Sequence, residues 1–166
     1  MKEHPTTILV IAGRFYEDIT AELIKGAVAE IEEQGALHEL VEVPGALEIP
    51  QVFAAACAAG LMREDGRYDG AVALGCVIRG ETSHYETVAN ESARALMDIA
   101  TRFATPVGNG ILTVETSEQA WERAAVADGN KGGDAAKACL TLIEVYRKLR
   151  SANADRGPIG FGSPKT

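Results

Sequence analysis

Cysteines are scarce in this sequence and show no pairing pattern. The 166 residues include only Cys57, Cys76 and Cys139, and no two of them stand at the Cys-x-x-Cys spacing of a metal knuckle. An odd number of cysteines in a chain of this size indicates free thiols rather than a disulfide framework. We therefore expect a reducing, cytoplasmic environment and no metal site.

Long hydrophobic runs and an excess of positive charge are also missing. The apolar run near the start covers only residues 8–12, too short for the core of a signal peptide or for a membrane span. The 16 Lys and Arg residues are outnumbered by 24 Asp and Glu residues, which gives a formal net charge of -8. Because such a chain repels polyanions, we expect no nucleic acid as a partner, and the short apolar run predicts no membrane partner. An anionic ligand would need a pocket with a few well-placed cations.

The sequence does contain enough apolar residues for one full core. Hydrophobic residues make up 46% of the chain and charged residues 24%, both typical of globular proteins. At roughly 150 residues per domain, the length predicts a single domain over residues 1–150. Residues 151–166 include three glycines and two prolines without an apolar period, so we expect a loose tail there.

Four short apolar runs alternate with segments of helical periodicity. The expected strands cover residues 7–12, 37–43, 70–78 and 106–114. The first expected helix has its apolar stripe at Ile19, Leu23, Ala27 and Ile31. The later expected helices cover residues 47–59, 83–103, 117–126 and 135–149.

Helix ends are marked by capping residues and glycines. Asp18 is available as the cap of the first helix, and Thr116 with Gln119 forms a capping box. Residues 128–133 are rich in glycine and are expected to separate the last two helices.

The alternation of strands and helices predicts the fold class. With right-handed crossovers, it gives a four-stranded parallel sheet with helices on both faces, a three-layer α/β fold. Ligands of open α/β sheets bind beyond the carboxyl ends of the strands. Candidate site residues therefore lie in the loops after the four strands, at residues 13–16, 44–48, 79–84 and 113–116.

The loop after the third strand fits most of a phosphate-binding pattern. Residues 75–82 match G-x-x-x-x-G-K-[ST] except that Glu81 replaces the lysine. A carboxylate at that position repels a triphosphate, which excludes a nucleoside triphosphatase. Gly80 and Thr82 at a helix N-terminus still suit a single phosphate group.

His84 follows in the first turn of the expected helix. The helix dipole there disfavours the protonated ring, so we expect a neutral imidazole that can accept a proton. The alternative is a histidine on a solvated face, and its position at the end of a strand favours function. Cys76 fits a small core residue better than the nucleophile of a Cys76–His84 pair.

Other polar and aromatic residues have two interpretations each. From composition alone, Phe15 plugs the corner after the first strand rather than stacking on a flat ligand. Glu48 either accepts hydrogen bonds from a hydroxylated ligand or stabilises the N-terminus of the second helix. Spacing alone makes Arg123 and Lys131 ordinary surface charges.

Several of these segments together resemble the lumazine synthase family of riboflavin biosynthesis. Residues 44–50 (PGALEIP) are similar to the family motif PGA[FL]EIP, and residues 75–91 (GCVIRGETSHYETVANE) are similar to its longest signature. Residues 110–113 and 130–132 match later motifs in the same order. The resemblance runs from the first strand to the last helix.

The resemblance implies a flavodoxin-like subunit that forms homopentamers with active sites shared between neighbours. It also implies the reaction. The family condenses 5-amino-6-(D-ribitylamino)uracil with L-3,4-dihydroxy-2-butanone 4-phosphate to 6,7-dimethyl-8-ribityllumazine, releasing phosphate and water without cofactor or metal. Assembly beyond the pentamer stays open.

The resemblance further implies roles for individual residues. The pyrimidine and its ribityl chain would contact Phe15, Ala46, Leu47, Glu48, Val77 and Ile78. The phosphate would be held by Gly80, Glu81, Thr82 and Ser83, with Arg123 reaching it from a neighbouring subunit and Lys131 as a further cation. His84 matches the histidine to which the family's proton transfers are assigned.

Two positions depart from the family pattern. Tyr16 stands where the family commonly has asparagine, and Asn109 stands at a substrate-site position where many members have phenylalanine. Both changes are expected to alter the pocket or its affinity for flavins.

Other functions on this fold class remain in view. A related riboflavin synthase would dismutate two lumazines, and a flavin-binding protein would store or sense flavin with little catalysis. A response-regulator receiver needs acidic residues after the first strand and an aspartate after the third. Because Gly13-Arg14 and Arg79-Gly80 occupy those places, we exclude it.

Overall fold

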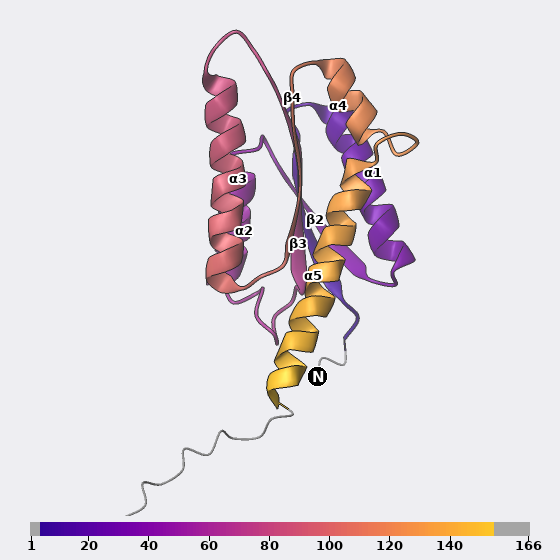
Figure 1. The fold of residues 1–166 in the computed structure, drawn as a ribbon, viewed down its shortest axis with the longest axis vertical. Helices are drawn as coiled ribbons and strands as arrows, with labels where there is room; N and C mark the ends of the chain where they lie inside the picture. The colour runs from indigo at the N-terminus through magenta and orange to yellow at the C-terminus, as the bar shows by residue number, and fades with distance from the viewer. Residues whose placement is uncertain (1–3, 155–166) are drawn as a thin grey trace, which may run out of the picture.

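A computed structural model describes residues 4–154 and contains one parallel sheet (Figure 1). Its strands are β1 (Thr7–Gly13), β2 (Leu37–Val43), β3 (Gly70–Ile78) and β4 (Val107–Val114). They are ordered β2-β1-β3-β4, and every neighbouring pair is parallel. The predicted four-stranded parallel sheet is confirmed.

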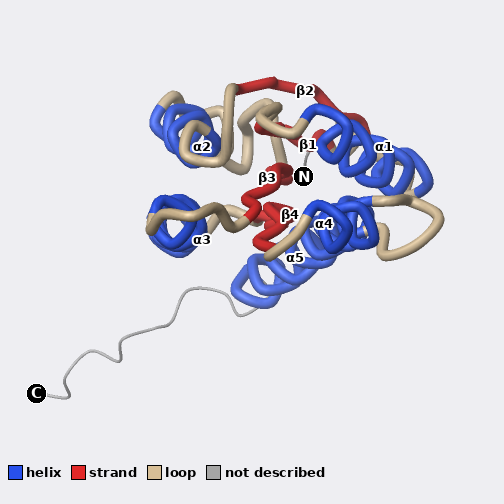
Figure 2. Tube along the Cα trace, turned by 90° about the horizontal axis from the view of Figure 1, so that it is seen from above, coloured by secondary structure: helices blue, strands red, loops and turns tan. Residues whose placement is uncertain are grey.

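Helices cover both faces of this sheet (Figure 2). One face carries α1 (Glu17–Glu33), α4 (Ser117–Ala124) and α5 (Lys131–Ala154). The other carries α2 (Ile49–Ala58) and α3 (His84–Phe103). The three-layer, flavodoxin-like α/β fold is therefore confirmed.

The two cores follow from the alternation of side chains along β1 and β3. Val10 and Val72 point toward α1 and α5, whereas Ile11 and Ala73 point toward α2 and α3, and all four are fully buried. Because these central strands are covered on both faces, they read as continuous apolar runs in the sequence.

Two helix starts test the predicted caps. Thr116 caps α4, since its side chain accepts a hydrogen bond from the Gln119 backbone N–H at 3.2 Å. The predicted cap of α1 is wrong, because Tyr16 occupies the N-cap position without a side-chain bond. Asp18 lies in the first turn, where its negative charge suits the helix dipole.

α5 is longer than the sequence predicted. It begins at Lys131 rather than residue 135, and the Asn130 side chain accepts a bond from the Gly133 N–H at 3.3 Å. Gly132 is helical because its missing side chain lets the helix approach α1, where a Cβ would overlap the Leu23 carbonyl oxygen. The prediction that Gly132 and Gly133 belong to the break between the last two helices was therefore wrong.

α5 also runs on to Ala154, past the predicted end at residue 149. The first residues of the expected tail, 151–154, are thus helical, and residues 155–166 lie outside the described part of the chain. Within residues 4–154, no helix has the length and apolar content that a membrane crossing requires.

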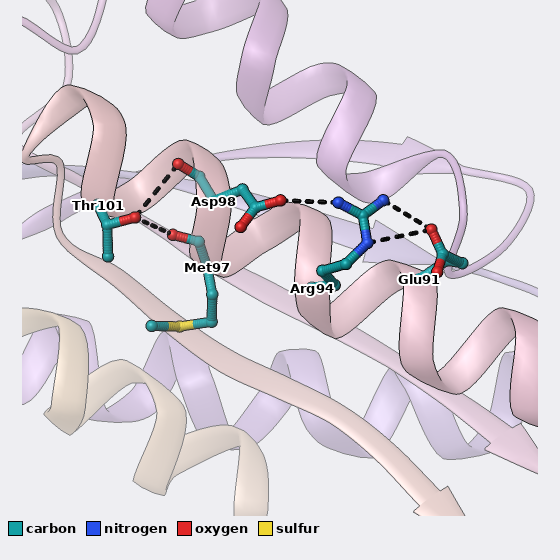
Figure 3. Close-up of polar contacts among 5 residues, drawn as sticks. All are labelled: Glu91, Arg94, Met97, Asp98 and Thr101. Carbon is teal, nitrogen blue, oxygen red and sulfur yellow. Dashed lines mark hydrogen bonds and ion pairs between the residues drawn. The ribbon is translucent and has the colours of Figure 1, made fainter.

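The outer face of α3 carries a chain of local polar contacts (Figure 3). Arg94 pairs with Glu91 and with Asp98, the latter at 2.7 Å, and the Thr101 hydroxyl donates to the Met97 carbonyl at 2.8 Å. The two Arg94 pairs, three and four residues apart, favour the helical conformation of this exposed segment. This face contributes no side chain to the cavity described below.

The strand order fixes where a ligand can enter. The connection after β1 leads to one side of the sheet and the connection after β3 leads to the other, so the carboxyl ends of β1 and β3 flank a topological switch point. The loops that follow these strands diverge there and leave a crevice.

The packing of α5 on β4 gives a first prediction. A Cβ on Gly108 would overlap the Ala135 carbonyl oxygen and lie 2.8 Å from its carbonyl carbon. Because backbone atoms cannot rotate away, we expect Gly108→Ala to lower the free energy of unfolding by about 1–3 kcal/mol. Urea denaturation followed by circular dichroism measures the change.

Gly80→Ala is the matched control for this prediction, because a Cβ on Gly80 meets no atom within 4 Å. Equal denaturation midpoints for Gly108→Ala and the control would contradict the close approach of β4 and α5.

Candidate functional site

A cavity of about 360 Å³ opens at the switch point, between the loops after β1, β2 and β3. It is lined by Phe15, Tyr16, Pro44, Gly45, Ala46, Leu47, Glu48, Cys76, Val77, Ile78, Gly80, Thr82, His84, Tyr85 and Val88. Three loops that are far apart in the sequence thus meet at one site, as the position of the strand ends predicted.

A close backbone contact brings two of these loops together. A Cβ on Gly13 would lie 2.9 Å from the carbonyl carbon of Gly45, so only glycine fits between the end of β1 and the turn after β2. The Arg14 N–H also donates to the Val43 carbonyl at 2.9 Å, which continues the ladder beyond the strand ends. Phe15 and Ala46 therefore line one cavity.

Phe15 does not plug the corner, contrary to the expectation from composition. Its side chain is 74% exposed, and it forms an edge-to-face pair with Tyr16, with ring centroids 5.0 Å apart at 76°. Tyr16 is half-buried and packs against the core. The exposed face of Phe15 is consequently held in place and available to a flat ligand.

Glu48 occupies the N-cap position of α2 but makes no capping bond with its side chain. A Cβ on Gly45 would lie 3.3 Å from the Glu48 Oε2 atom, which shows that the carboxylate folds over the loop. Its position in the cavity lining favours the role of an acceptor for ligand hydroxyls over that of a helix cap.

The loop after β3 supplies the polar end of the cavity. Thr82 and His84 both line it, and the His84 N–H lies 3.4 Å from the Thr82 hydroxyl oxygen as the donor of a long hydrogen bond. Ser83 is the N-cap of α3 without a side-chain capping bond. Backbone N–H groups of this first turn are suited to hold an anion beside the imidazole.

The predicted residues divide into two groups. The structure brings nine of them to the cavity: Phe15, Ala46, Leu47, Glu48, Val77, Ile78, Gly80, Thr82 and His84. Glu81 and Ser83 belong to the same loop but do not line the cavity.

Asn109, Arg123 and Lys131 are not brought to the cavity within one chain. Asn109 lies on β4, where its side-chain oxygen accepts a bond from the Ile111 N–H at 3.0 Å. Arg123 donates to the Gln119 carbonyl at 3.0 Å, and Lys131 pairs with Asp134 at 2.8 Å. All three are exposed and lie outside the cavity lining.

Sequence reasoning missed two cavity residues on α3. Tyr85 is half-buried beside His84, and Val88 follows four positions after His84. Residues four apart share a helix face, so helical spacing from His84 is the signal that identifies Val88. Tyr85 has no comparable signal in the sequence.

The cysteines are all buried and free, and Cys76 is the one that lines the cavity. Burial raises the pKa of Cys76 to about 11 and that of Cys139 to about 12. A thiol in such surroundings is a poor nucleophile because the thiolate is the reactive form. Cys76 therefore acts as part of the apolar floor.

The described residues do not form a cluster of metal ligands. Within residues 4–154, His, Cys, Asp and Glu side chains do not gather in groups of three or more that could hold a metal ion. The cavity instead combines an exposed aromatic ring, one carboxylate, hydroxyl and N–H donors and one imidazole. This arrangement can stack a flat ring, accept bonds from hydroxyls and move a proton.

Comparisons with known proteins show the family of this chain. Residues 5–147 match the family model described as 6,7-dimethyl-8-ribityllumazine synthase. The chain is 53% identical to "6,7-dimethyl-8-ribityllumazine synthase 1" of Rhodopseudomonas palustris over 146 residues, which cover 87% of this chain and 88% of the relative. It is 57% identical to the 6,7-dimethyl-8-ribityllumazine synthase of Methylorubrum extorquens strain PA1, over 86% of this chain and 82% of that one.

The enzyme of the same name from Agrobacterium fabrum is 52% identical over 86% of this chain and 95% of its own length. The matched region contains every strand and every loop that lines the cavity. This chain belongs to the 6,7-dimethyl-8-ribityllumazine synthase family.

Proposed function

We propose that this protein condenses 5-amino-6-(D-ribitylamino)uracil with L-3,4-dihydroxy-2-butanone 4-phosphate to form 6,7-dimethyl-8-ribityllumazine, a transferase reaction that releases phosphate and water. The observation that carries the proposal is the cavity at the switch point. It gathers Phe15, Glu48, Thr82 and His84, four positions to which the family resemblance assigns substrate contacts or proton transfer. We place the enzyme in riboflavin biosynthesis and in the cytoplasm.

The two substrates fit different parts of the cavity. The pyrimidine stacks on the exposed ring of Phe15, while Val77 and Ile78 contact its edge from the end of β3. The ribityl hydroxyls donate to Glu48 beside Ala46 and Leu47. The phosphate of the second substrate lies at the turn of residues 80–83, at the N-terminus of α3.

The phosphate needs a cation that this chain does not supply to its own cavity. No lysine or arginine is among the described residues of the lining, and the chain carries a net charge of -8. A dianion in such surroundings is poorly held by N–H groups alone. We infer that Arg123 reaches the phosphate from a neighbouring subunit, with Lys131 as a further cation and Asn109 at the shared boundary.

This inference makes the enzyme a homo-oligomer, and the family resemblance points to a pentamer. Exposed apolar side chains support association. Met97 and Phe103 on α3 are 54% and 50% exposed, and Trp121 on α4 is 49% exposed. α3 and α4 lie on opposite faces of the sheet, so exposed apolar side chains are available for contacts between chains on both faces.

His84 performs the proton transfers in this proposal. The amine of the uracil attacks the ketone and water leaves to give a Schiff base. The imidazole then takes a proton from the carbon skeleton as the phosphate departs. The resulting enol becomes a ketone, the ribityl-bearing nitrogen attacks it to close the ring, and a second water leaves to give the lumazine. A positioned base contributes roughly 10²–10⁴-fold to such a step, and holding the two substrates together supplies much of the rest.

The test is a direct assay with both substrates, followed by lumazine absorbance with and without EDTA. We expect equal lumazine formation in both samples. A folded protein that forms no lumazine but binds riboflavin would instead indicate flavin storage, and consumption of added lumazine to give riboflavin would indicate a riboflavin synthase.

A substitution of the proton acceptor gives the second prediction. We expect His84→Ala to lower kcat by about 10²-fold without abolishing turnover, because positioning of the substrates and the phosphate contacts remain. Steady-state kinetics on both substrates measures this effect.

His38→Ala is the control, since His38 lies on β2 with its Nδ1 atom 4.0 Å from Glu32, outside the cavity lining. Complete loss of turnover in a folded His84→Ala enzyme that still binds both substrates would contradict the proposed role.

The buried thiols give the third prediction. With a pKa of about 11, only about one Cys76 thiol in a thousand is ionised near pH 8, and burial also raises the pKa values of Cys57 and Cys139. We expect slow reaction with a thiol reagent in the native protein and rapid reaction of all three cysteines after denaturation. If one thiol of the native protein reacts rapidly with the reagent and this reaction is lost in Cys76→Ala, Cys76 would be a candidate nucleophile after all.

A further inference from the structure

The side chain of Arg79 joins three elements at the polar end of the cavity. It follows β3 directly, and its backbone N–H donates to the Val114 carbonyl at the end of β4 at 2.9 Å. Its guanidinium donates from Nε to Glu115 at 2.7 Å and from Nη1 to Glu86 in the first turn of α3. The ends of two strands and the start of one helix therefore meet at this one guanidinium.

An aromatic ring completes the arrangement around Arg79. The Cζ atom lies 4.3 Å from the ring centroid of Tyr85, a cation–π geometry. Tyr85 lines the cavity beside His84 and also lines a second hollow, which Arg79 and Asn109 line as well. Arg79 thus supports a wall of the cavity from outside and is absent from the lining itself.

Glu86 and Glu115 both form ion pairs with Arg79. The hydrogen bond from Arg79 lowers the pKa of Glu86, which keeps that carboxylate ionised in the pair. With carboxylates on Nε and Nη1, Arg79 is compensated in charge and unsuited to serve as the phosphate cation. Its role is to hold groups in place.

The first turn of α3 has few other restraints. Residues 81–84 are exposed, Ser83 makes no capping bond with its side chain, and the bond between Thr82 and the His84 N–H is long at 3.4 Å. The Arg79 contacts to Tyr85 and Glu86 are accordingly the main side-chain links between this turn and the sheet.

We propose that Arg79 is a positioning residue for the condensation, which fixes His84 and Tyr85 by clamping the first turn of α3 to the ends of β3 and β4. The proposal rests on the function proposed above. It assigns to Arg79 an effect on turnover through His84 and no direct contact with the phosphate.

A double-mutant cycle with His84 tests this route. We expect Arg79→Ala to lower kcat by about tenfold, with KM for the ribitylaminouracil changed by less than about twofold, because a displaced base slows proton transfer while the contacts to the pyrimidine and its ribityl chain remain. In a His84→Ala background, Arg79→Ala should lower kcat little further, since the base that Arg79 positions is gone. Arg79→Lys should recover only part of the lost kcat. An ammonium group cannot bond two carboxylates at once while it stacks on an aromatic ring.

Arg67 provides a matched control at the opposite end of the sheet. Its guanidinium also bonds a carboxylate, Glu39, and its Cζ atom lies 5.9 Å from the ring centroid of Tyr68. We expect Arg67→Ala to leave kcat and both KM values unchanged. Equal losses of kcat from Arg79→Ala with and without His84, or a raised KM for the ribitylaminouracil, would overturn the proposal.

A second measurement keeps the inference separate from the activity. Amide hydrogen exchange of residues 87–90, the first N–H groups of α3 that have acceptors inside the helix, should become faster in Arg79→Ala than in the wild type and in Arg67→Ala, while exchange in β3 stays the same. Unchanged exchange at this turn overturns the clamp even in an active enzyme. Faster exchange in a protein that makes no lumazine supports the clamp and overturns the proposed function alone.

Discussion

The backbone of Gly13 lies against the backbone of Gly45, and the cavity depends on that contact. A side chain at residue 13 would push apart the loops after β1 and β2, and with them Phe15 and Glu48. The parallel sheet brings the strand ends to one edge, but the edge becomes a site only because two loops can approach to backbone distance. Apolar floor residues from β3 then close the space between them.

Much of this could be predicted from the sequence, because the relevant signals are local. The continuous apolar runs of β1 and β3 reflect burial on both faces, and strand order places the following loops together. The start of α5 could not be predicted, because Gly132 serves a close contact with Leu23 that only the tertiary structure contains. The exposure of Phe15 could not be predicted from composition for the same reason, since the support of its ring by Tyr16 depends on how the corner folds.

The residues that the cavity lacks are as informative as those it holds. Arg123 and Lys131 carry the charge that a phosphate requires, yet each contacts its own neighbourhood on α4 or α5. Sequence alone could not show this separation, because spacing along a chain says nothing of distance across a fold. The family resemblance assigns Arg123 to a neighbouring subunit, and its position outside the cavity is compatible with that assignment.

The polar end of the cavity shows how a short helical turn can be placed with little burial. His84 and Thr82 are exposed, so packing does not fix them as it fixes the floor. Order there has to come from directional contacts, and the Arg79 guanidinium supplies them to Glu86, Glu115 and Tyr85. Exposed ion pairs contribute little to overall stability. The three partners of Arg79 therefore matter for the position of this turn rather than for the free energy of unfolding. For the proposed condensation, which depends on holding two substrates and one base in position, that geometry bears directly on rate.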